Sequence, residues 1–125
     1  MFEQFLLQGS VLSVALMVYA CNVMIEAARL NKIDPRGICY APKIIVHPLS
    51  GLFMLAATPC ILWPAIYIGL YDGWISGVVA WFILQVVGVL MYLILGIRYC
   101  ELIGIHFALA CIAFPIGYYL SMSSF

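Results

Sequence analysis

The sequence predicts an all-α protein, an integral membrane bundle of four transmembrane helices with both termini on the non-cytoplasmic side. Hydrophobic residues make up 67% of the 125 positions and charged residues only 8%, whereas soluble domains average roughly 45–50% and 25%. The apolar residues form four stretches, each near the length of about 20 residues that crosses a bilayer. All five basic residues lie in two short segments between these stretches.

The basic residues give the predicted orientation. Four of them separate the first and second apolar stretches, and Arg98 separates the third and fourth; the four are Arg29, Lys32, Arg36 and Lys43. Because Lys and Arg next to spans are retained in the cytoplasm, both segments are expected on that side, and four crossings then place both termini outside. The net charge is zero, which gives no indication of a nucleic-acid partner.

The spans follow one another with short connections, so residues 1–125 are expected to form a single domain. We predict spans at about 5–28, 43–70, 74–97 and 101–120. Turn signals of Pro, Asp and Gly lie at 34–37 and at 71–73. Aromatic rings near the second turn are expected to mark the outer membrane interface; they are Trp63, Tyr67, Tyr71 and Trp74.

A polar stripe runs along the first span. Its members recur at steps of four and three and so share one helical face; they are Gln8, Leu12, Ala15, Tyr19, Asn22, Glu26 and Arg29. A charge facing lipid at the bilayer centre costs about 2.5–3.5 kcal/mol, so this face is expected to turn inward or toward a partner. It is either a polar pathway with Glu26 as its ionisable member, or a set of interhelical hydrogen bonds with a Glu26–Arg29 pair near the membrane edge.

Two prolines interrupt the middle of the second span. Pro59 cannot donate to the carbonyl of Leu55, nor Pro64 to that of Cys60. Freed carbonyls at membrane depth need neighbours, water or a ligand. The segment is therefore either a broken helix of the kind that builds ion sites in transporters, or a simple kink that the Thr58 hydroxyl helps to compensate.

The third and fourth spans carry faces rich in small residues, which allow close helix packing. In the third span the face comprises Gly77, Trp81, Gln85, Gly88, Tyr92 and Gly96. In the fourth it comprises His106, Ala110, Ala113 and Gly117. Gln85 is expected at mid-membrane, where an amide needs a partner. We take Tyr19, Asn22, Glu26 and Gln85 as the candidate functional face.

Ionisable residues gather in or near the predicted cytoplasmic leaflet. This candidate cluster comprises Arg29, His47, Arg98, Glu101 and His106. Two histidines at similar depth could ligate haem or a metal, or move protons. Alternatively, one is interfacial and the other is hydrogen-bonded within the bundle. No other metal ligands are predicted. The five cysteines show no CxxC spacing and are not expected to form a disulfide framework.

The sequence contains no phosphate-binding loop, catalytic triad or HExxH motif, so we expect no enzyme. The leading hypothesis is a non-catalytic accessory or structural subunit of a larger membrane complex. The alternatives are a homo-oligomeric small channel or transporter, and a redox membrane anchor associated with haem or quinone. The expected partners are membrane lipid and other integral membrane subunits, no cofactor is required, and the short loops suit a bacterial or archaeal cytoplasmic membrane or an organellar inner membrane.

Overall fold

The structure, a computed structural model, describes residues 2–34, 36 and 42–124, and of residues 100 and 101 only the backbone. In that part of the chain every regular element is a helix. The elements are α1 (Glu3–Gln8), α2 (Val11–Ile33), α3 (Lys43–Val46), α4 (Ser50–Ala57), the 3₁₀ helix η1 (Thr58–Ile61), α5 (Trp63–Asp72), α6 (Trp74–Ile94) and α7 (Cys100–Ser123). Four segments are long and apolar enough to cross a membrane: Val11–Ile33, Ser50–Asp72, Trp74–Ile94 and Leu102–Ser123. The predicted four-helix membrane bundle is confirmed.

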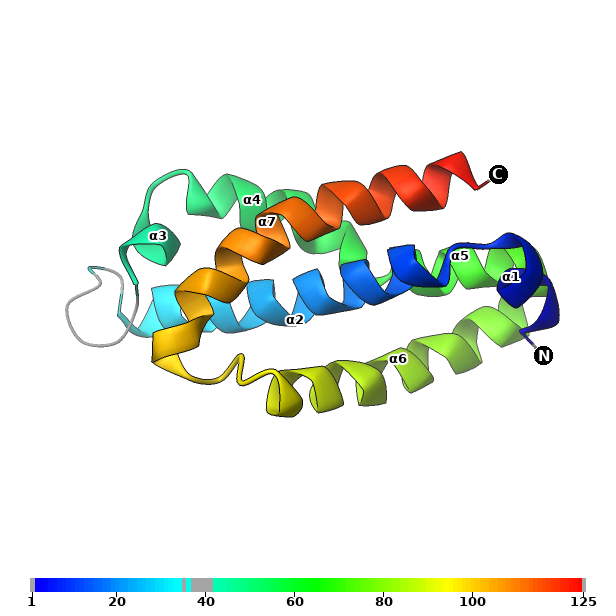
Figure 1. Cartoon of the computed structure of the whole chain (residues 1–125), viewed down its shortest axis with the longest axis horizontal. Coiled ribbons are helices and arrows are strands. Elements are labelled where there is room, and N and C mark those ends of the chain that lie inside the picture. The colour runs from blue at the N-terminus through cyan, green and yellow to red at the C-terminus, as the bar shows by residue number, and fades with distance from the viewer. Residues whose placement is uncertain (1, 35, 37–41, 125) are drawn as a thin grey trace.

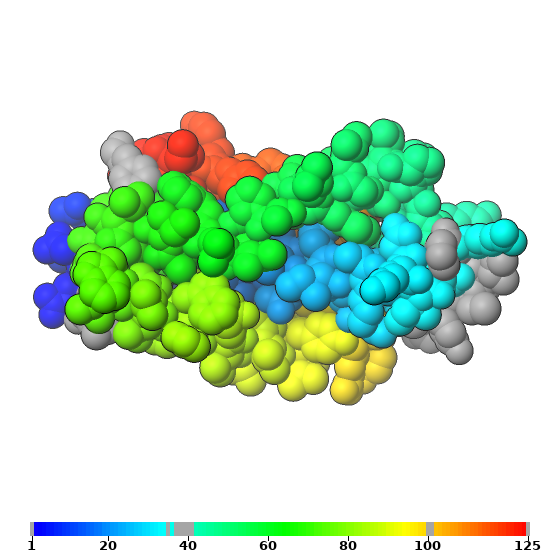
Figure 2. Space-filling model, turned by 180° about the vertical axis from the view of Figure 1, so that it is seen from behind, coloured from blue at the N-terminus to red at the C-terminus, as the bar shows by residue number. Residues whose placement is uncertain are grey.

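Helix α2 forms the centre of the bundle and contacts α7, α6, η1 and the segments around them. Figure 1 shows both termini at one end, beside α1 and the α5–α6 turn, and α3 at the other end. From behind, α2 (blue) is visible between α4 and η1 (green) and α6 (yellow) (Figure 2). The termini thus share an end, as an even number of crossings requires, and their placement outside the cytoplasm stays a prediction.

The first membrane helix lies further along the chain than the predicted range 5–28. Ser10 is extended, and its side chain accepts a hydrogen bond from the Ser13 backbone N–H at 3.2 Å, which is a typical N-cap. The preceding residues form the separate helix α1. The Asp72 carboxylate accepts two backbone N–H bonds at its start, at 3.1 and 2.9 Å, where it also complements the helix dipole.

The second predicted span, 43–70, is interrupted near its start. Pro48 disfavours helical backbone in the residue before it, and His47 is extended with φ −62° and ψ 143°. The Ser50 hydroxyl donates to the carbonyl of His47 at 2.7 Å and also bonds to the carbonyl of Ile45. The continuous run of helix therefore begins at Ser50 and ends at Asp72.

Pro59 tightens the helix into η1. Because of the tighter turn, the Leu55 carbonyl accepts from the Thr58 backbone N–H. The next carbonyl, of Ala56, accepts from the Tyr118 hydroxyl on α7 at 2.8 Å. The Thr58 hydroxyl donates to the Met54 carbonyl at 3.2 Å. Protein groups thus satisfy the carbonyls of Met54, Leu55 and Ala56, as the simpler of the two interpretations expects.

The third span ends earlier than the predicted residue 97. Gly96 adopts φ +69°, and the Ile97 N–H donates to the Tyr92 carbonyl at 3.2 Å. This is the six-to-one hydrogen bond of a Schellman motif, which closes a helix at a left-handed glycine. The fourth span, predicted as 101–120, is slightly longer in the structure.

Small residues set the two closest helix contacts. Ala110, Ala113 and Gly117 of α7 are buried, and a Cβ added at Gly117 would lie 3.2 Å from the Ser13 carbonyl of α2. Likewise, Gly77 of α6 faces Gly69 of α5. Gly77 of the third-span face and the small residues of the fourth-span face are therefore packing positions.

Candidate polar sites within the bundle

The predicted polar face does not form one site. Gln8 belongs to α1, apart from the stripe, and Leu12 is exposed. Tyr19, Asn22 and Glu26 of α2 each turn to different partners. The structure divides them into three groups at separate positions along the helix.

The first group surrounds Glu26. Its side chain is 6% exposed and forms an ion pair with the half-exposed Arg29, one turn further along α2. The Tyr92 hydroxyl of α6 donates to Glu26 Oε2 at 3.2 Å. A buried carboxylate requires a charge partner and further donors, and both are present here.

The bounds of α2 place Glu26 further from the helix end than predicted. Seven residues separate it from Ile33, which is roughly 10 Å of helix at a rise of 1.5 Å per residue. The helix continues past residue 28, the predicted end of the span, and the position of Glu26 relative to the membrane edge stays a prediction. Tyr92 was singled out only as a packing residue, because the sequence gives no indication of a contact between α6 and Glu26.

The second group centres on His106 of α7. Its Nε2 lies 3.0 Å from the Leu95 carbonyl at the end of α6, and its Nδ1 lies 2.7 Å from the Tyr19 hydroxyl. Because a carbonyl only accepts, Nε2 carries the hydrogen and Nδ1 accepts from Tyr19. His106 thus joins three helices and uses both ring nitrogens in doing so, which agrees with a histidine hydrogen-bonded within the bundle.

The third group lies near the middle of the bundle. Asn22 and Gln85 both line a small cavity between α2, η1, α5 and α6, together with Trp81. The Asn22 amide donates to the Val18 carbonyl at 2.8 Å and packs against Gly88. Gln85 is exposed, and its side-chain amide has no hydrogen bond within residues 2–34, 36 and 42–124.

Trp81 was not predicted to carry an unmatched polar group. Its Nε1 is buried and has no acceptor in the described part of the chain. An unsatisfied buried donor costs about 1–3 kcal/mol. Trp81 and Gln85 are one turn apart on α6, so the helix carries two neighbouring polar groups without partners from the described residues.

The described residues of the predicted cytoplasmic cluster make their hydrogen bonds with groups outside it. His47 is exposed, and its Nδ1 accepts the Leu49 N–H at 3.1 Å. Arg98 is also exposed, and its guanidinium contacts the Tyr99 ring and hydroxyl. The side chain of Glu101 lies outside the described residues. Among the residues described, no three His, Cys, Asp or Glu side chains converge as metal ligands.

The aromatic residues expected at the outer interface differ in role. Only Trp74 is strongly exposed. Tyr67 is fully buried, and its hydroxyl accepts from the Ser10 N–H at 2.7 Å and bonds to Ser124. Trp63 donates to Ser121 at 2.9 Å. These hydroxyl and indole groups join α5 to the ends of α2 and α7, and the position of the rings at the outer membrane interface stays a prediction.

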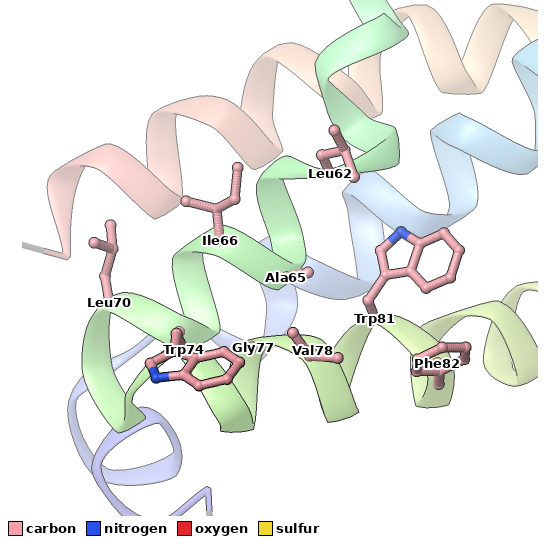
Figure 3. A pocket seen from close by; sticks show the side chains of 10 residues that line it. Leu62, Ala65, Ile66, Leu70, Trp74, Gly77, Val78, Trp81 and Phe82 are labelled. Carbon is pink, nitrogen blue, oxygen red and sulfur yellow. The ribbon is translucent and has the colours of Figure 1, made fainter.

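An apolar groove of about 560 Å³ lies on the outside of the α5–α6 hairpin. Figure 3 shows Leu62, Ile66 and Leu70 along one wall, with Trp74, Val78 and Phe82 along the other. Gly77 and Ala65 lie where the two helices approach most closely. The groove has the shape and chemistry to accept an apolar side chain or acyl chain.

Comparison of the chain with models of protein families, with curated proteins and with solved structures gave no match. The geometry of the chain is therefore the basis for the proposals below.

Proposed function

We propose that this protein is a non-catalytic subunit of a larger membrane complex and that it binds its partner through α6. The observation that carries the proposal is Gln85, an exposed amide at the middle of a membrane-spanning helix. Gln85 lies eleven residues from Trp74 and nine from Ile94, or roughly 14–17 Å from either end of α6. That depth is hydrocarbon in a bilayer about 30 Å thick.

Helix α6 is also the least covered of the four spans. Only 17% of its most apolar window is buried, against 50% for α2. Val78, Phe82, Gln85 and Val89 are all exposed and recur at steps of four, three and four, so they share one face of the helix. We define these four residues as the α6 face. Two of them also line the groove on the α5–α6 hairpin.

A partner helix explains this face better than lipid does. Lipid tails accommodate valine and phenylalanine, but they offer no hydrogen bond to an amide, whereas Ser, Thr, Asn or Gln on a neighbouring helix does. Such a bond is worth roughly 0.6–2 kcal/mol in membranes. The expected partner is therefore an integral membrane protein with a polar side chain at mid-membrane. The short connections of the chain are consistent with a bacterial, archaeal or organellar inner membrane.

The test is purification of the tagged protein from its native membrane in mild detergent, followed by mass spectrometry of the proteins that co-purify. A fixed set of larger membrane proteins is expected with the wild type. Gln85→Leu should lower their recovery several-fold. Val86→Leu is the matched control, because Val86 is exposed next to Gln85 but offers no hydrogen bond, and its recovery of partners should equal that of the wild type.

A single species at a multiple of 13.9 kDa would contradict the accessory-subunit proposal. It would favour the second candidate, a homo-oligomeric channel or transporter. The observation behind that candidate is Glu26, an ionisable group roughly 10 Å inside its helix and buried against α6. Glu26→Gln should then change ion flux into liposomes that contain the protein, and flux equal to that of empty liposomes would exclude this candidate.

A further inference from the structure

We infer that the groove between α3, α4 and α7 binds an anionic phospholipid of the leaflet that borders the basic end of the bundle. The groove has a volume of about 500 Å³, within the range of about 300–1,000 Å³ typical of ligand sites. It is lined by Lys43, Ile44, His47, Leu49, Ser50, Phe53, Phe107, Ala108 and Cys111. This site is separate from the α6 face and does not depend on the proposed function.

The break between α3 and α4 creates the groove. Helix α3 contacts both α2 and α7, and α4 contacts α2 further along. The extended backbone at His47 and the hydrogen bonds of the Ser50 hydroxyl hold the connection in its bend. Residues of α3, α4 and their connection line one side of the groove, and Phe107 and Ala108 line it from the α7 side.

The polar and apolar groups of the groove are segregated. Lys43 and His47 lie on α3 and the connection, at the basic end of the bundle. Phe53 and Cys111 lie further along α4 and α7, toward the middle of the spans. A phospholipid has the same division, with a charged headgroup above an apolar chain. Basic pockets between membrane helices bind anionic headgroups in this way.

The hydrogen-bonding state of His47 suits a phosphate. Its Nδ1 accepts the Leu49 N–H, so the neutral ring carries its hydrogen on Nε2 and presents a donor there. Lys43 is exposed and supplies a positive charge with three donors. No acidic residue is among those that line the groove. The charge is therefore complementary to an anionic headgroup and not to a cation.

The test uses the purified full-length protein in a neutral detergent, titrated with phosphatidylglycerol, phosphatidylcholine or inorganic phosphate. Retained lipid is counted by native mass spectrometry. We expect the protein to retain phosphatidylglycerol preferentially. Lys43→Gln combined with His47→Gln should weaken that binding about fivefold or more, since a basic residue near an anionic surface contributes about 1 kcal/mol. Lys32→Gln is the matched control, because Lys32 is exposed near the same end but does not line the groove.

A second pair of variants tests the apolar part of the groove without changing the charge of the protein. Ala108→Trp should fill the groove and abolish retention of phosphatidylglycerol, whereas Leu109→Trp, at an exposed position outside the groove, should not. Equal retention of the two lipids, equal losses with Lys32→Gln and the double variant, or unchanged retention in Ala108→Trp would each overturn the inference. Competition by inorganic phosphate as effective as that by phosphatidylglycerol would also overturn it, because it would show an anion site without an acyl chain.

Discussion

Polar side chains in this bundle are joined across helices rather than arranged along one path. Tyr19 and Glu26 lie on the same face of α2, seven residues apart, yet Tyr19 bonds to His106 of α7 and Glu26 to Tyr92 of α6. The sequence predicted that these residues turn away from lipid, because their spacing alone puts them on one face. It could not predict their partners, since those depend on which helices neighbour α2.

The Glu26–Arg29 pair is the most consequential of these contacts for stability. Arg29→Gln should lower the free energy of unfolding by about 3 kcal/mol, because it leaves a buried carboxylate without its charge partner. Glu26→Gln should lower the free energy of unfolding by less, because the Arg29 side chain is 54% exposed and can reach lipid headgroups without its partner. The measurement is reversible unfolding of the purified protein by SDS in mixed micelles.

The double variant provides the control for this prediction. Combining Glu26→Gln with Arg29→Gln removes the buried charge and should recover at least half of the stability that Arg29→Gln loses. Losses that simply add in the double variant would show that the two side chains do not interact.

At the scale of helices, the sequence predicted the existence of all four spans but misplaced several ends. The apolar stretches are local signals and predicted the spans, and the prolines predicted an interruption of the second span, either a kink or a broken helix. The start of α2 was not predicted because it depends on the Ser10 cap. The separate helix α1 before it contacts Asp72, which is distant in sequence. Gly96 was predicted as a packing residue of the third span. In the structure its left-handed backbone ends α6.

The α5–α6 hairpin depends on a close backbone approach at Gly77. A Cβ there would lie 3.0 Å from the Ala65 carbonyl and 3.2 Å from the Gly69 Cα. Because both neighbours are backbone atoms, Gly77→Ala should destabilise the protein by about 1–3 kcal/mol through overpacking. Reversible unfolding of the purified variant by SDS in mixed micelles measures this loss of stability.

Gly51→Ala is the matched control, since a Cβ at Gly51 would meet nothing within 4 Å. Alanine is favoured over glycine in helices by up to about 1 kcal/mol, so this variant should be neutral or stabilising. If both variants changed the free energy of unfolding in the same direction, the proposed role of the close contact at Gly77 would be refuted.

For the whole molecule, the structure places basic residues from separate parts of the chain at one end. The end of α2, the start of α3 and the α6–α7 connection lie together (Figure 1), and they carry Lys32, Lys43 and Arg98. The opposite end carries Glu3 and Asp72. Folding thus gathers residues from three parts of the chain into one basic end, which is the distribution that retains loops in the cytoplasm.

The orientation follows as a prediction that can be checked in intact cells. Cysteines introduced at two exposed positions, Lys32→Cys and Ser123→Cys, are reacted with a membrane-impermeant maleimide before and after permeabilisation, with the wild type as control for its own cysteines. Ser123→Cys should react in intact cells, and Lys32→Cys only after permeabilisation. The reverse pattern would place the basic end outside. The groove of Lys43 and His47 would then border the outer leaflet, where anionic lipid is scarcer, and the inferred ligand would lose its main source.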